Sequence, residues 1–345
     1  MKREAENKMR RLFCGGAWAV ALMLCGTLSM LTFTACSDDD DGSYDLSNTI
    51  IETEDGDKLQ VTRVGSTYYG YDDDGYLNYF KWEGDEYEGS NNATKFTLPE
   101  DDEDYEMEIS LSYNGSGYIS KVIDKGSDYY DDDEYDSWEE SASLSYDGSG
   151  HLTKVSWSGK YTEVWDGDKD SYSSSGSITL TWSNGLLTKC VYKEDDYSEI
   201  YEYDYDDGLY LNAYCQHTPS TLGLDLLFEA FTYTGLCGKG PNYLPVTRTF
   251  TEVDYEDGEE DYSYTSTTTY KYGFNSDGTI DYQCLSSGKS YQYFEYANAD
   301  SYASSRASGI EEESESTDKS RRMGLFGRVS KHQRETATTA IPIND

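Results

Sequence analysis

A short glycine turn recurs along the chain, and it constrains the fold more than any other feature of the sequence. Each copy ends a strand-like stretch on an aromatic residue, passes through Asp, Asn or Ser to a glycine, and resumes with Leu or Ile and a small polar residue. The copies run over 71–78, 113–120, 146–153, 182–188, 205–212 and 274–281. Asp, Asn and Ser side chains bond their own backbone in turns, and glycine takes the positive-φ position of a tight hairpin loop. The recurrence of this turn therefore predicts a series of β-hairpins.

The turn glycines also give the spacing of the hairpins. They are Gly75, Gly117, Gly150, Gly185, Gly208 and Gly278. The interval between the last two is long enough for one degraded copy, and Gly240-Pro241-Asn242 is the candidate remnant. A regular interval of this kind indicates a repeated supersecondary unit.

The segments between the turns alternate as half-buried strands should. Over 107–113, Met, Ile, Leu and Tyr share one face, while Glu and Ser occupy the other. The residues five positions after a turn glycine form a predicted core column: Phe80, Val122, Val155 and Cys190. Tight turns are expected along one rim of the sheet, and longer acidic connections, such as 124–140 and 252–262, along the other.

These patterns predict an all-β chain with a long antiparallel up-and-down meander of hairpins. A sheet of about a dozen strands must curl or close into a barrel-like form to bury its edges. We expect the barrel not to be embedded in a membrane, because the strand face opposite the core column carries Ser, Thr, Lys and Glu. A membrane barrel presents a continuous apolar outer band instead.

The composition excludes some partners. Acidic residues number 67 and basic residues 27, which gives a net charge of −40. Such a charge repels nucleic acid, so we expect no nucleic-acid partner. High charge often accompanies disorder, but 35 Tyr, 10 Phe and 6 Trp favour a folded β-rich chain.

The N-terminus has the features of an export signal. Arg10 and Arg11 precede an uncharged stretch over 12–33, which ends in Phe33-Thr34-Ala35-Cys36. That ending resembles the lipobox of bacterial lipoproteins, which implies cleavage before Cys36 and acyl chains, palmitate among them, on that cysteine. The alternative is an uncleaved membrane anchor, since 22 residues can span the hydrocarbon core. Translation is expected to start at Met9 or at Met1.

The residues after the cysteine are acidic. Ser37 is followed by four aspartates: Asp38, Asp39, Asp40 and Asp41. This run resembles the export signal of Bacteroidetes surface lipoproteins, which implies an outer-membrane lipoprotein, lipid-anchored and exposed at the cell surface. The alternative is a plain acidic linker.

Turn cadence and lipobox together resemble a family of Bacteroidetes lipoproteins of uncharacterised function whose C-terminal domain is porin-like. The resemblance spans roughly 50–300. It implies a barrel-like sheet and brings no activity and no functional residues. The cadence is also similar to that of the Tyr-Asp repeat proteins of bacterial surfaces.

The chain divides into four predicted parts. Residues 1–35 are a lipoprotein signal peptide, 36–48 an acidic tether, 49–300 the β-meander domain, and 301–345 a disordered charged tail. Four cysteines fall after the lipid site: Cys190, Cys215, Cys237 and Cys284. They allow three disulfide pairings or none, the alternative being buried free thiols. None has the CxxC spacing of a zinc site.

No motif predicts a cofactor or a reaction. Asp166, Asp168 and Asp170 begin like a calcium-binding EF-hand loop, but Ser171 and Ser177 stand where glycine and a bidentate Glu belong. Calcium therefore remains a weak alternative, there or at the acidic stretches 101–104 and 131–134. Glycoside hydrolysis needs two carboxylates at a defined separation, which the sequence does not reveal. We expect a protein without catalytic activity.

Aromatic side chains offer the best candidates for ligand contact. Trp82 and Trp157 both lie seven residues after a turn glycine, which indicates packing. The candidates nearer to predicted loops are Trp138, Trp165, Tyr129 and Tyr130. They predict a non-catalytic binding or scaffold module for an extracellular glycan or protein, with carbohydrate as the leading ligand class. The alternative is a structural or adhesive envelope protein without a small ligand; a glycoside hydrolase or an outer-membrane channel ranks below both.

Overall fold

The structure is a computed structural model. It describes residues 44–299, except 54, 83–84, 91–92, 99–104, 132–133, 166–167, 211–230 and 257–258. The predicted signal peptide, the lipid site Cys36, the acidic run 37–41, Cys215, and the segment 301–345 therefore lie outside the described residues. No helix among the described residues is long and apolar enough to cross a membrane.

The described chain is built mainly from β-strands, with a short 3-10 helix, η1, over Leu46–Asn48 and a helical turn at 231–233. The first strands are short: β1 (Ile51–Glu52), β2 (Lys58–Val64), β3 (Thr67–Tyr71), β4 (Leu77–Trp82), β5 (Asp85–Ser90), β6 (Lys95–Thr97) and β7 (Tyr105–Tyr113). The middle strands are mostly longer: β8 (Ile119–Asp131), β9 (Glu134–Tyr146), β10 (Leu152–Trp165), β11 (Asp168–Ser183), β12 (Leu186–Glu194), β13 (Tyr197–Tyr210), β14 (Tyr243–Glu256) and β15 (Glu259–Phe274). Two short strands follow, β16 (Ile280–Leu285) and β17 (Gln292–Asn298).

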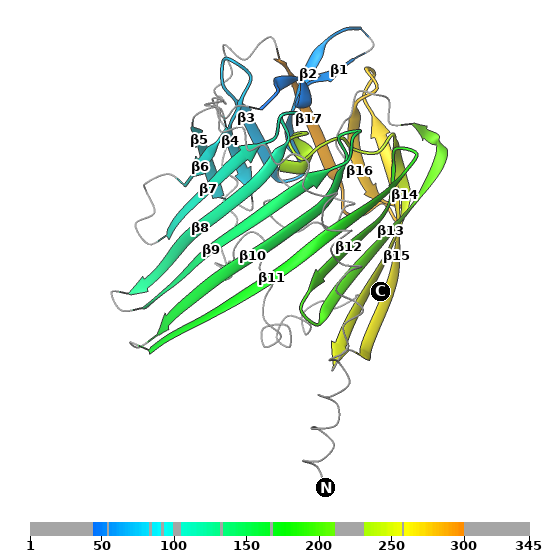
Figure 1. The fold of residues 1–345 in the computed structure, drawn as a ribbon. Coiled ribbons are helices and arrows are strands. Elements are labelled where there is room, and N and C mark those ends of the chain that lie inside the picture. Colours follow the sequence, from blue (N-terminus) through cyan, green and yellow to red (C-terminus); the bar gives the residue numbers. More distant parts are fainter. Residues whose placement is uncertain are drawn as a thin grey trace, which may run out of the picture. The chain divides into compact units, whose positions relative to one another are not determined.

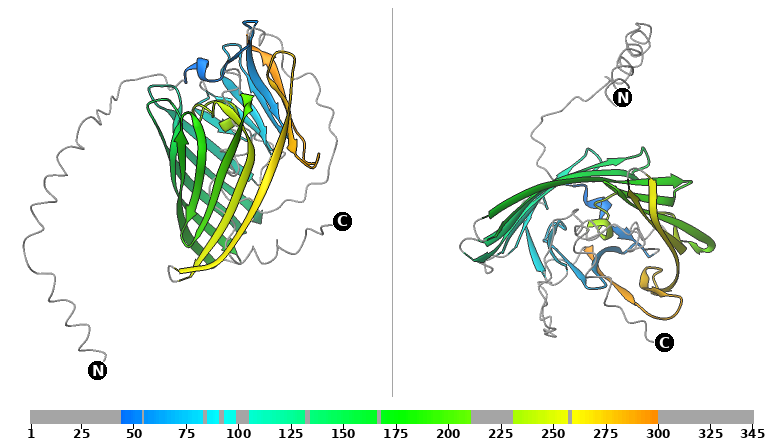
Figure 2. Two further views of the ribbon diagram at one scale, coloured as in Figure 1. Left: turned by 90° about the vertical axis from the view of Figure 1, so that its right-hand side faces the viewer. Right: turned by 90° about the horizontal axis from the view of Figure 1, so that it is seen from below.

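The strands form a closed antiparallel barrel. From β2 to β17, each strand pairs with the next one in the sequence, and β17 pairs with β2 through Phe294 and Val64. This ring has sixteen strands, and β1 adds a short pairing to β2. Figures 1 and 2 show the strands following one another around the ring. The predicted meander of hairpins closed into a barrel-like sheet is therefore confirmed.

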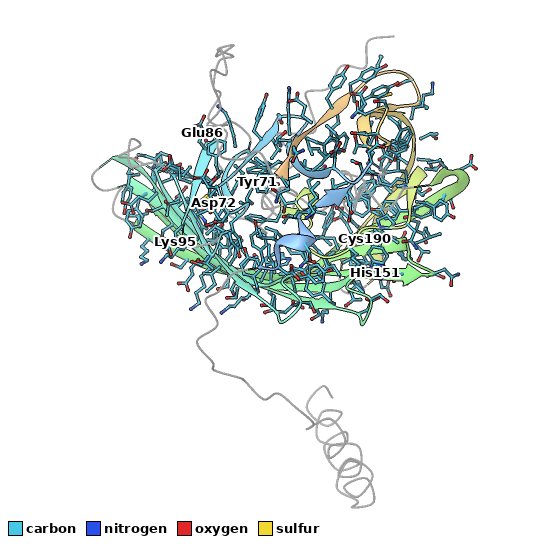
Figure 3. All side chains as sticks on the ribbon, turned by 90° about the horizontal axis from the view of Figure 1, so that it is seen from above. Tyr71, Asp72, Glu86, Lys95, His151 and Cys190 are labelled. Carbon is cyan, nitrogen blue, oxygen red and sulfur yellow. The ribbon has the colours of Figure 1, made fainter. Side chains whose placement is uncertain are left out.

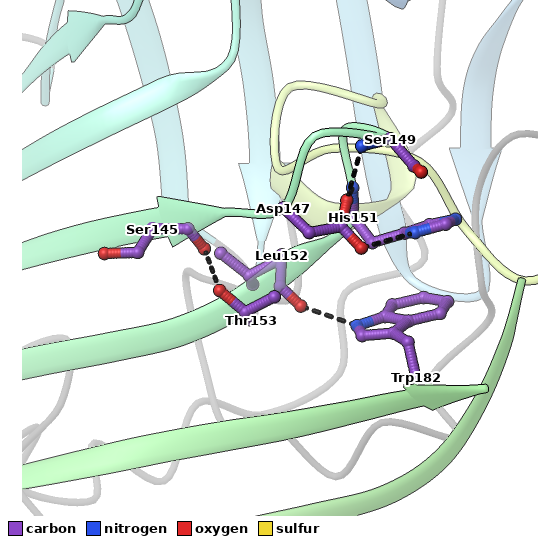
Figure 4. Close-up of polar contacts among 7 residues, drawn as sticks. All are labelled: Ser145, Asp147, Ser149, His151, Leu152, Thr153 and Trp182. Atoms are coloured by element: carbon purple, nitrogen blue, oxygen red, sulfur yellow. Dashed lines mark hydrogen bonds and ion pairs between the residues drawn. The ribbon is translucent and has the colours of Figure 1, made fainter.

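The recurrent turns have the predicted geometry. Glycines at five of the predicted positions adopt φ between 75° and 89°: Gly75, Gly117, Gly150, Gly185 and Gly278. In the turn over 147–151, a carboxylate oxygen of Asp147 accepts bonds from the N–H groups of Ser149 (2.8 Å) and His151 (3.0 Å) (Figure 4). The His151 ring binds the same carboxylate and stacks on Trp182, with 4.3 Å between ring centroids. Local side-chain chemistry thus fixes this turn.

The prediction of a hairpin turn at Gly208 is wrong. Gly208 lies inside β13, where Tyr205 pairs with Pro245 and Tyr210 with Tyr243 across an irregular register. The proposed remnant at 240–242 does not close a hairpin either, because Asn242 donates its N–H to the carbonyl of Gly185 (3.0 Å) in another turn. The turn-like sequence around Gly208 is instead part of an irregular strand.

The acidic stretches predicted as long connections are also strands. The β8–β9 pairing continues from Asp124 and Glu140 to Asp131 and Glu134, and β14–β15 continues to Glu256 and Glu259. Ser, Tyr and Trp alternate with the carboxylates there and support extended backbone. As a result β8–β11 and β13–β15 are longer than the strands around them, and the barrel is taller on that side (Figure 1). We call β8–β15 the tall side.

The predicted core column is confirmed. Phe80, Val122, Val155 and Cys190 are each at most 1% exposed. Trp82 and Trp157 are also buried, as expected for packing positions.

Glycines inside strands lie opposite aromatic rings. The cross-strand pairs are Gly70 with Tyr79, Gly89 with Phe96, Gly126 with Trp138, Gly176 with Trp157, and Gly273 with Tyr282. In each pair a Cβ on the glycine would meet the partner's side chain at 3.1 Å or less. Large rings in a crowded wall therefore require these glycines, and each ring packs over the bare backbone of its partner.

Two segments of the chain fill the barrel at the rim of the glycine turns (Figures 2 and 3). In the first, Tyr44 is 2% exposed and its hydroxyl accepts the N–H of Leu77 (2.6 Å). In the second, Phe231 packs on Phe80 with 5.4 Å between ring centroids, and Leu236 accepts the N–H of Ile119 (2.8 Å). Both segments therefore pack inside the barrel.

Candidate functional site: the inner face of the tall side

The two faces of the tall side differ in chemistry. On each strand, every second residue shares a face with the buried core and defines the inner face. The other residues form the outer face. On β11 the outer residues are Lys169, Ser171, Ser173, Ser175, Ser177, Thr179, Thr181 and Ser183. The outer face of this strand is therefore polar along its whole length.

Basic residues follow the same division. The lysines of the tall side all alternate to the outer face: Lys121, Lys125, Lys154, Lys160, Lys169, Lys189, Lys193 and Lys271. Within the described part of β8–β15, Arg248 is the one basic residue on the inner face, and it lies over the ring of Tyr201. The inner face is thus strongly deficient in positive charge.

Four carboxylates form a lateral row across the inner face, which we call the acidic row. Asp128 of β8 pairs with Asp136 of β9, Asp136 with Glu163 of β10, and Glu163 with Asp170 of β11. Directly opposed residues in antiparallel strands have Cα atoms about 4.5–5.5 Å apart. Like charges in such positions repel, so the row is a region of concentrated negative potential.

Tyrosine hydroxyls border the acidic row. Tyr130 donates its hydroxyl to Oδ2 of Asp136 (3.0 Å), and burial together with this carboxylate raises the pKa of Tyr130. Burial, followed by the nearby charges of Glu163 and Asp136, raises the pKa of Tyr172 to about 12. Both phenols are therefore protonated at neutral pH and serve as donors to the row.

An aromatic row lies next to the acidic row, deeper in the barrel. Trp138, Tyr161 and Tyr172 are successive cross-strand partners on β9, β10 and β11. The rings of Tyr161 and Tyr172 stack with 4.9 Å between centroids. Trp138 donates its indole N–H to Oδ2 of Asp124 (3.2 Å). Trp138 and Tyr161 are buried, whereas Tyr172 is 39% exposed.

Carboxylates continue into the buried part of the barrel. Asp124 and Glu140 are cross-strand partners with 0% exposure each, and Tyr161 donates its hydroxyl to Glu140. On the opposite wall, Glu199 is 2% exposed and accepts the hydroxyl of Tyr201 (2.6 Å). The interior is thus lined by tyrosine–carboxylate pairs as well as by apolar side chains.

The predicted ligand aromatics fall on different faces. Trp165 lies at the inner edge of the tall side and is 58% exposed, and Tyr130 lies at the acidic row. Tyr129 alternates to the outer face, beside Tyr135. Trp138 is 7% exposed, so its predicted position near a loop is wrong, because the supposed loop is a strand.

Several inner-face residues were missed by the sequence reasoning. Tyr262 and Tyr264 of β15 are 51% and 49% exposed and lie opposite Asp254 and Glu252. Asp128, Asp136 and Tyr262 lie in the stretches 124–140 and 252–262, which are predicted from the sequence to be long connections. The alternation of carboxylates with Ser, Tyr and Trp was the signal that could have revealed a strand face.

The calcium and disulfide alternatives gain no support from the described residues. No group of three His, Cys, Asp or Glu side chains among them is placed to hold a metal ion, and Asp166 lies outside this part of the chain. Cys190, Cys237 and Cys284 are buried free thiols. Burial raises the pKa of Cys190 and Cys237, so these two thiols are poor nucleophiles.

The fold defines a class, the closed antiparallel β-barrel with a filled upper end. No family model matches the sequence, and no curated protein sequence matches it. Among solved structures, the chain is similar to a porin-like protein from Bacteroides uniformis, with 15% identity and a TM-score of 0.44 over 75% of this chain and 100% of the other. A porin-like protein from Bacteroides vulgatus gives 14% identity and a TM-score of 0.46 over 69% of this chain and 98% of the other.

Proposed function

We propose that the protein is a non-catalytic binding module, held to the outer membrane by lipid on Cys36 and exposed at the cell surface. Its ligand site is the inner face of the tall side. The lipobox-like ending at Cys36 and the acidic run over 37–41 support the anchor and the export.

The chemistry of the outer face favours a barrel that is surrounded by water rather than embedded in lipid. Strands embedded in lipid carry an apolar outer band about 25 Å tall. The outer residues of β11 are instead Ser, Thr and Lys, and on the neighbouring strands Lys125 and Lys160 flank Glu139. The lipid, rather than the strands, would therefore provide the attachment to the membrane.

Carbohydrate is the ligand class that we propose. Sugar rings pack their C–H faces on aromatic rings, and their hydroxyls donate to carboxylates. Trp165, Tyr172, Tyr262 and Tyr264 are each at least 39% exposed on the inner face; the acidic row lies beside the first two, and Asp254 and Glu252 lie opposite the other two. The observation that carries the proposal is this combination of exposed aromatic rings and carboxylates on one face.

A ligand-binding experiment tests this proposal. The whole chain is screened against cell-surface and dietary polysaccharides, and its melting temperature is measured with and without each. Trp165→Ala should weaken binding of a hit at least tenfold. Tyr129→Ala is the matched control, because it removes an exposed aromatic ring from the outer face, and it should leave affinity within twofold. Equal losses in both variants, or no stabilising polysaccharide, would overturn the assignment.

A structural or adhesive role without a small ligand is the second candidate. The observation in its favour is that buried carboxylates such as Glu199 are already bonded to tyrosine hydroxyls. In this case the inner carboxylates would stabilise the interior of the barrel through these hydrogen bonds and would contact no ligand.

Exposure at the cell surface is tested separately. Proteinase K is applied to intact cells that carry the wild type, Cys36→Ala, or the aspartates 38–41 changed to alanine. Surface export by the acidic run predicts digestion of the wild type and protection of the alanine-run variant. A protected but membrane-bound wild type would place the protein in the periplasm and favour the structural role.

A further inference from the structure

We propose that the acidic row is a docking site for the basic segment 319–334 of the same chain. This segment lies outside the described residues, and its sequence is Lys-Ser-Arg-Arg-Met-Gly-Leu-Phe-Gly-Arg-Val-Ser-Lys-His-Gln-Arg. It contains six Lys or Arg residues and no Asp or Glu, in a chain where acidic residues outnumber basic ones by 67 to 27. The inference stands independently of the proposed carbohydrate ligand.

Charge complementarity is the first argument. Asp128, Asp136, Glu163 and Asp170 lie side by side on four neighbouring strands. The lysines in the described part of these strands alternate to the outer face, so none of them lies on the face of the row. A cationic occupant would relieve the repulsion within the row and would gain from the concentrated potential.

The side chains around the row supply the second argument. Trp165 and Tyr172 expose aromatic rings next to the carboxylates. Arginine guanidinium groups bind carboxylates through two bonds and also stack on aromatic rings. The basic segment has four arginines, and Met323, Leu325 and Phe326 lie among them, so its composition matches a face of mixed acidic and aromatic character.

The length of the intervening chain is the third argument. The last strand ends at Asn298, and twenty residues separate it from Lys319. Fully extended, they span about 66 Å. The 14 residues of β10 cover only about 46 Å along the barrel wall. The basic segment can therefore reach the inner face of its own barrel from either rim.

If the segment docks in this way, the acidic row of the full chain is occupied by residues 319–334 of the same chain. An external ligand that uses the inner face would compete with the segment, and the competition would weaken with salt because the contact is ionic. The full chain would then bind such a ligand less tightly than a chain with a neutral segment.

The experiment uses a labelled peptide of residues 319–334 and the whole chain with those six basic residues changed to Gln. Fluorescence anisotropy should show the peptide binding to this variant one to one, and at least tenfold more weakly to the wild type, whose site is occupied. Binding to the variant should weaken at least tenfold in 0.5 M salt. Absence of peptide binding, or equal binding to wild type and variant, would overturn the proposal.

Charge variants of the barrel locate the site. In the same background, Asp136→Asn, Glu163→Gln and Asp170→Asn combined should weaken peptide binding at least tenfold. The matched control is Glu139→Gln, Glu202→Gln and Asp204→Asn combined, which removes three carboxylates from the outer face and should change affinity less than twofold. Circular dichroism melts verify that both sets are folded. Equal losses in the two sets would show a non-specific charge effect and would reject the site.

Crosslinking of the wild type tests whether docking occurs within one chain. A carbodiimide should join Lys319 or Lys331 to Glu163, Asp170 or Asp136, with the product remaining monomeric by light scattering. Crosslinks found only in dimers would assign the segment to a second copy and would overturn docking in the same chain. A failed polysaccharide screen leaves all of these readouts unchanged.

Discussion

Glu163 of β10 lies directly opposite Asp170 of β11, and on its other side it lies directly opposite Asp136 of β9. Three carboxylates are thus consecutive neighbours across strands on one face. Cross-strand pairs of like charge reduce sheet stability. The protein retains this arrangement on its inner face while it places Glu139 between two lysines on the outer face.

The first prediction concerns this contrast. In the chain whose six basic residues in 319–334 are changed to Gln, Glu163→Gln should raise the free energy of unfolding by about 0.5 kcal/mol at low salt, because it removes repulsion from both neighbours in an unoccupied row. The gain should shrink in 1 M salt, where the screening length is about 3 Å. Urea denaturation at both salt concentrations measures it.

Glu139→Gln is the control on the opposite face. It breaks favourable pairings with Lys125 and Lys160 and should lower stability slightly at low salt. Opposite signs for the two variants are expected. The same sign for both would show that the net charge of the protein, rather than the row, determines the response.

The second prediction concerns the phenol of Tyr172. Burial, then the charge of Glu163, raises its pKa to about 12, above the usual value of 10. The folded state therefore keeps this proton to higher pH than the unfolded state does. The stability linked to it is fully present below pH 10 and is lost as the pH rises to 12. Titration by NMR with ¹³Cζ-labelled tyrosine, assigned through Tyr172→Phe, measures the pKa.

Removing the carboxylate beside Tyr172 checks the cause. Glu163→Gln should bring the pKa of Tyr172 closer to 10. Glu139 lies on the outer face, so Glu139→Gln should leave the pKa of Tyr172 unchanged. An unmoved value in Glu163→Gln would exclude Glu163 as a cause and leave burial and the charges of Asp136 and Glu140.

The turns and the core column could be predicted from the sequence because both depend on local chemistry. The carboxylate of Asp147 bonds N–H groups within four residues, and Gly150 supplies the positive φ that the turn needs. Val155 then follows at a fixed strand spacing and is fully buried. Such short-range rules require no knowledge of the rest of the barrel.

The acidic row and the true strand lengths could not be predicted in the same way. Strand detection relies on apolar residues at every second position, whereas the inner face of β8 and β9 carries Asp124, Asp128, Asp136 and Glu140 at these positions. Ring closure between β17 and β2 depends on residues more than two hundred positions apart, such as Arg63 and Glu295. Neither feature leaves a local pattern.

The third prediction concerns the turn at Gly117. This residue has a φ of 76°, and a Cβ there would collide with Asp45 of the segment that fills the barrel. Gly117→Ala should therefore lower the free energy of unfolding by about 1–3 kcal/mol. Gly115 lies in the same turn, where a Cβ would meet no atom within 4 Å, so Gly115→Ala should be nearly neutral. Thermal melts compare the two, and equal losses would contradict the packed position of Asp45.

The fourth prediction tests whether the inner segment around Phe231 is part of the core. Phe231 is 1% exposed, and its ring lies 5.4 Å from that of Phe80 and 5.9 Å from that of Phe96. Phe231→Ala should lower the free energy of unfolding by about 3–5 kcal/mol, because it leaves a cavity between strands that the segment holds together. Phe274→Ala removes a ring that is 44% exposed and should cost less than about 1 kcal/mol. Urea denaturation measures the free energy of unfolding of both variants. A small loss at Phe231 would mean that the barrel wall is stable without this segment, and that the core lies in the strands alone.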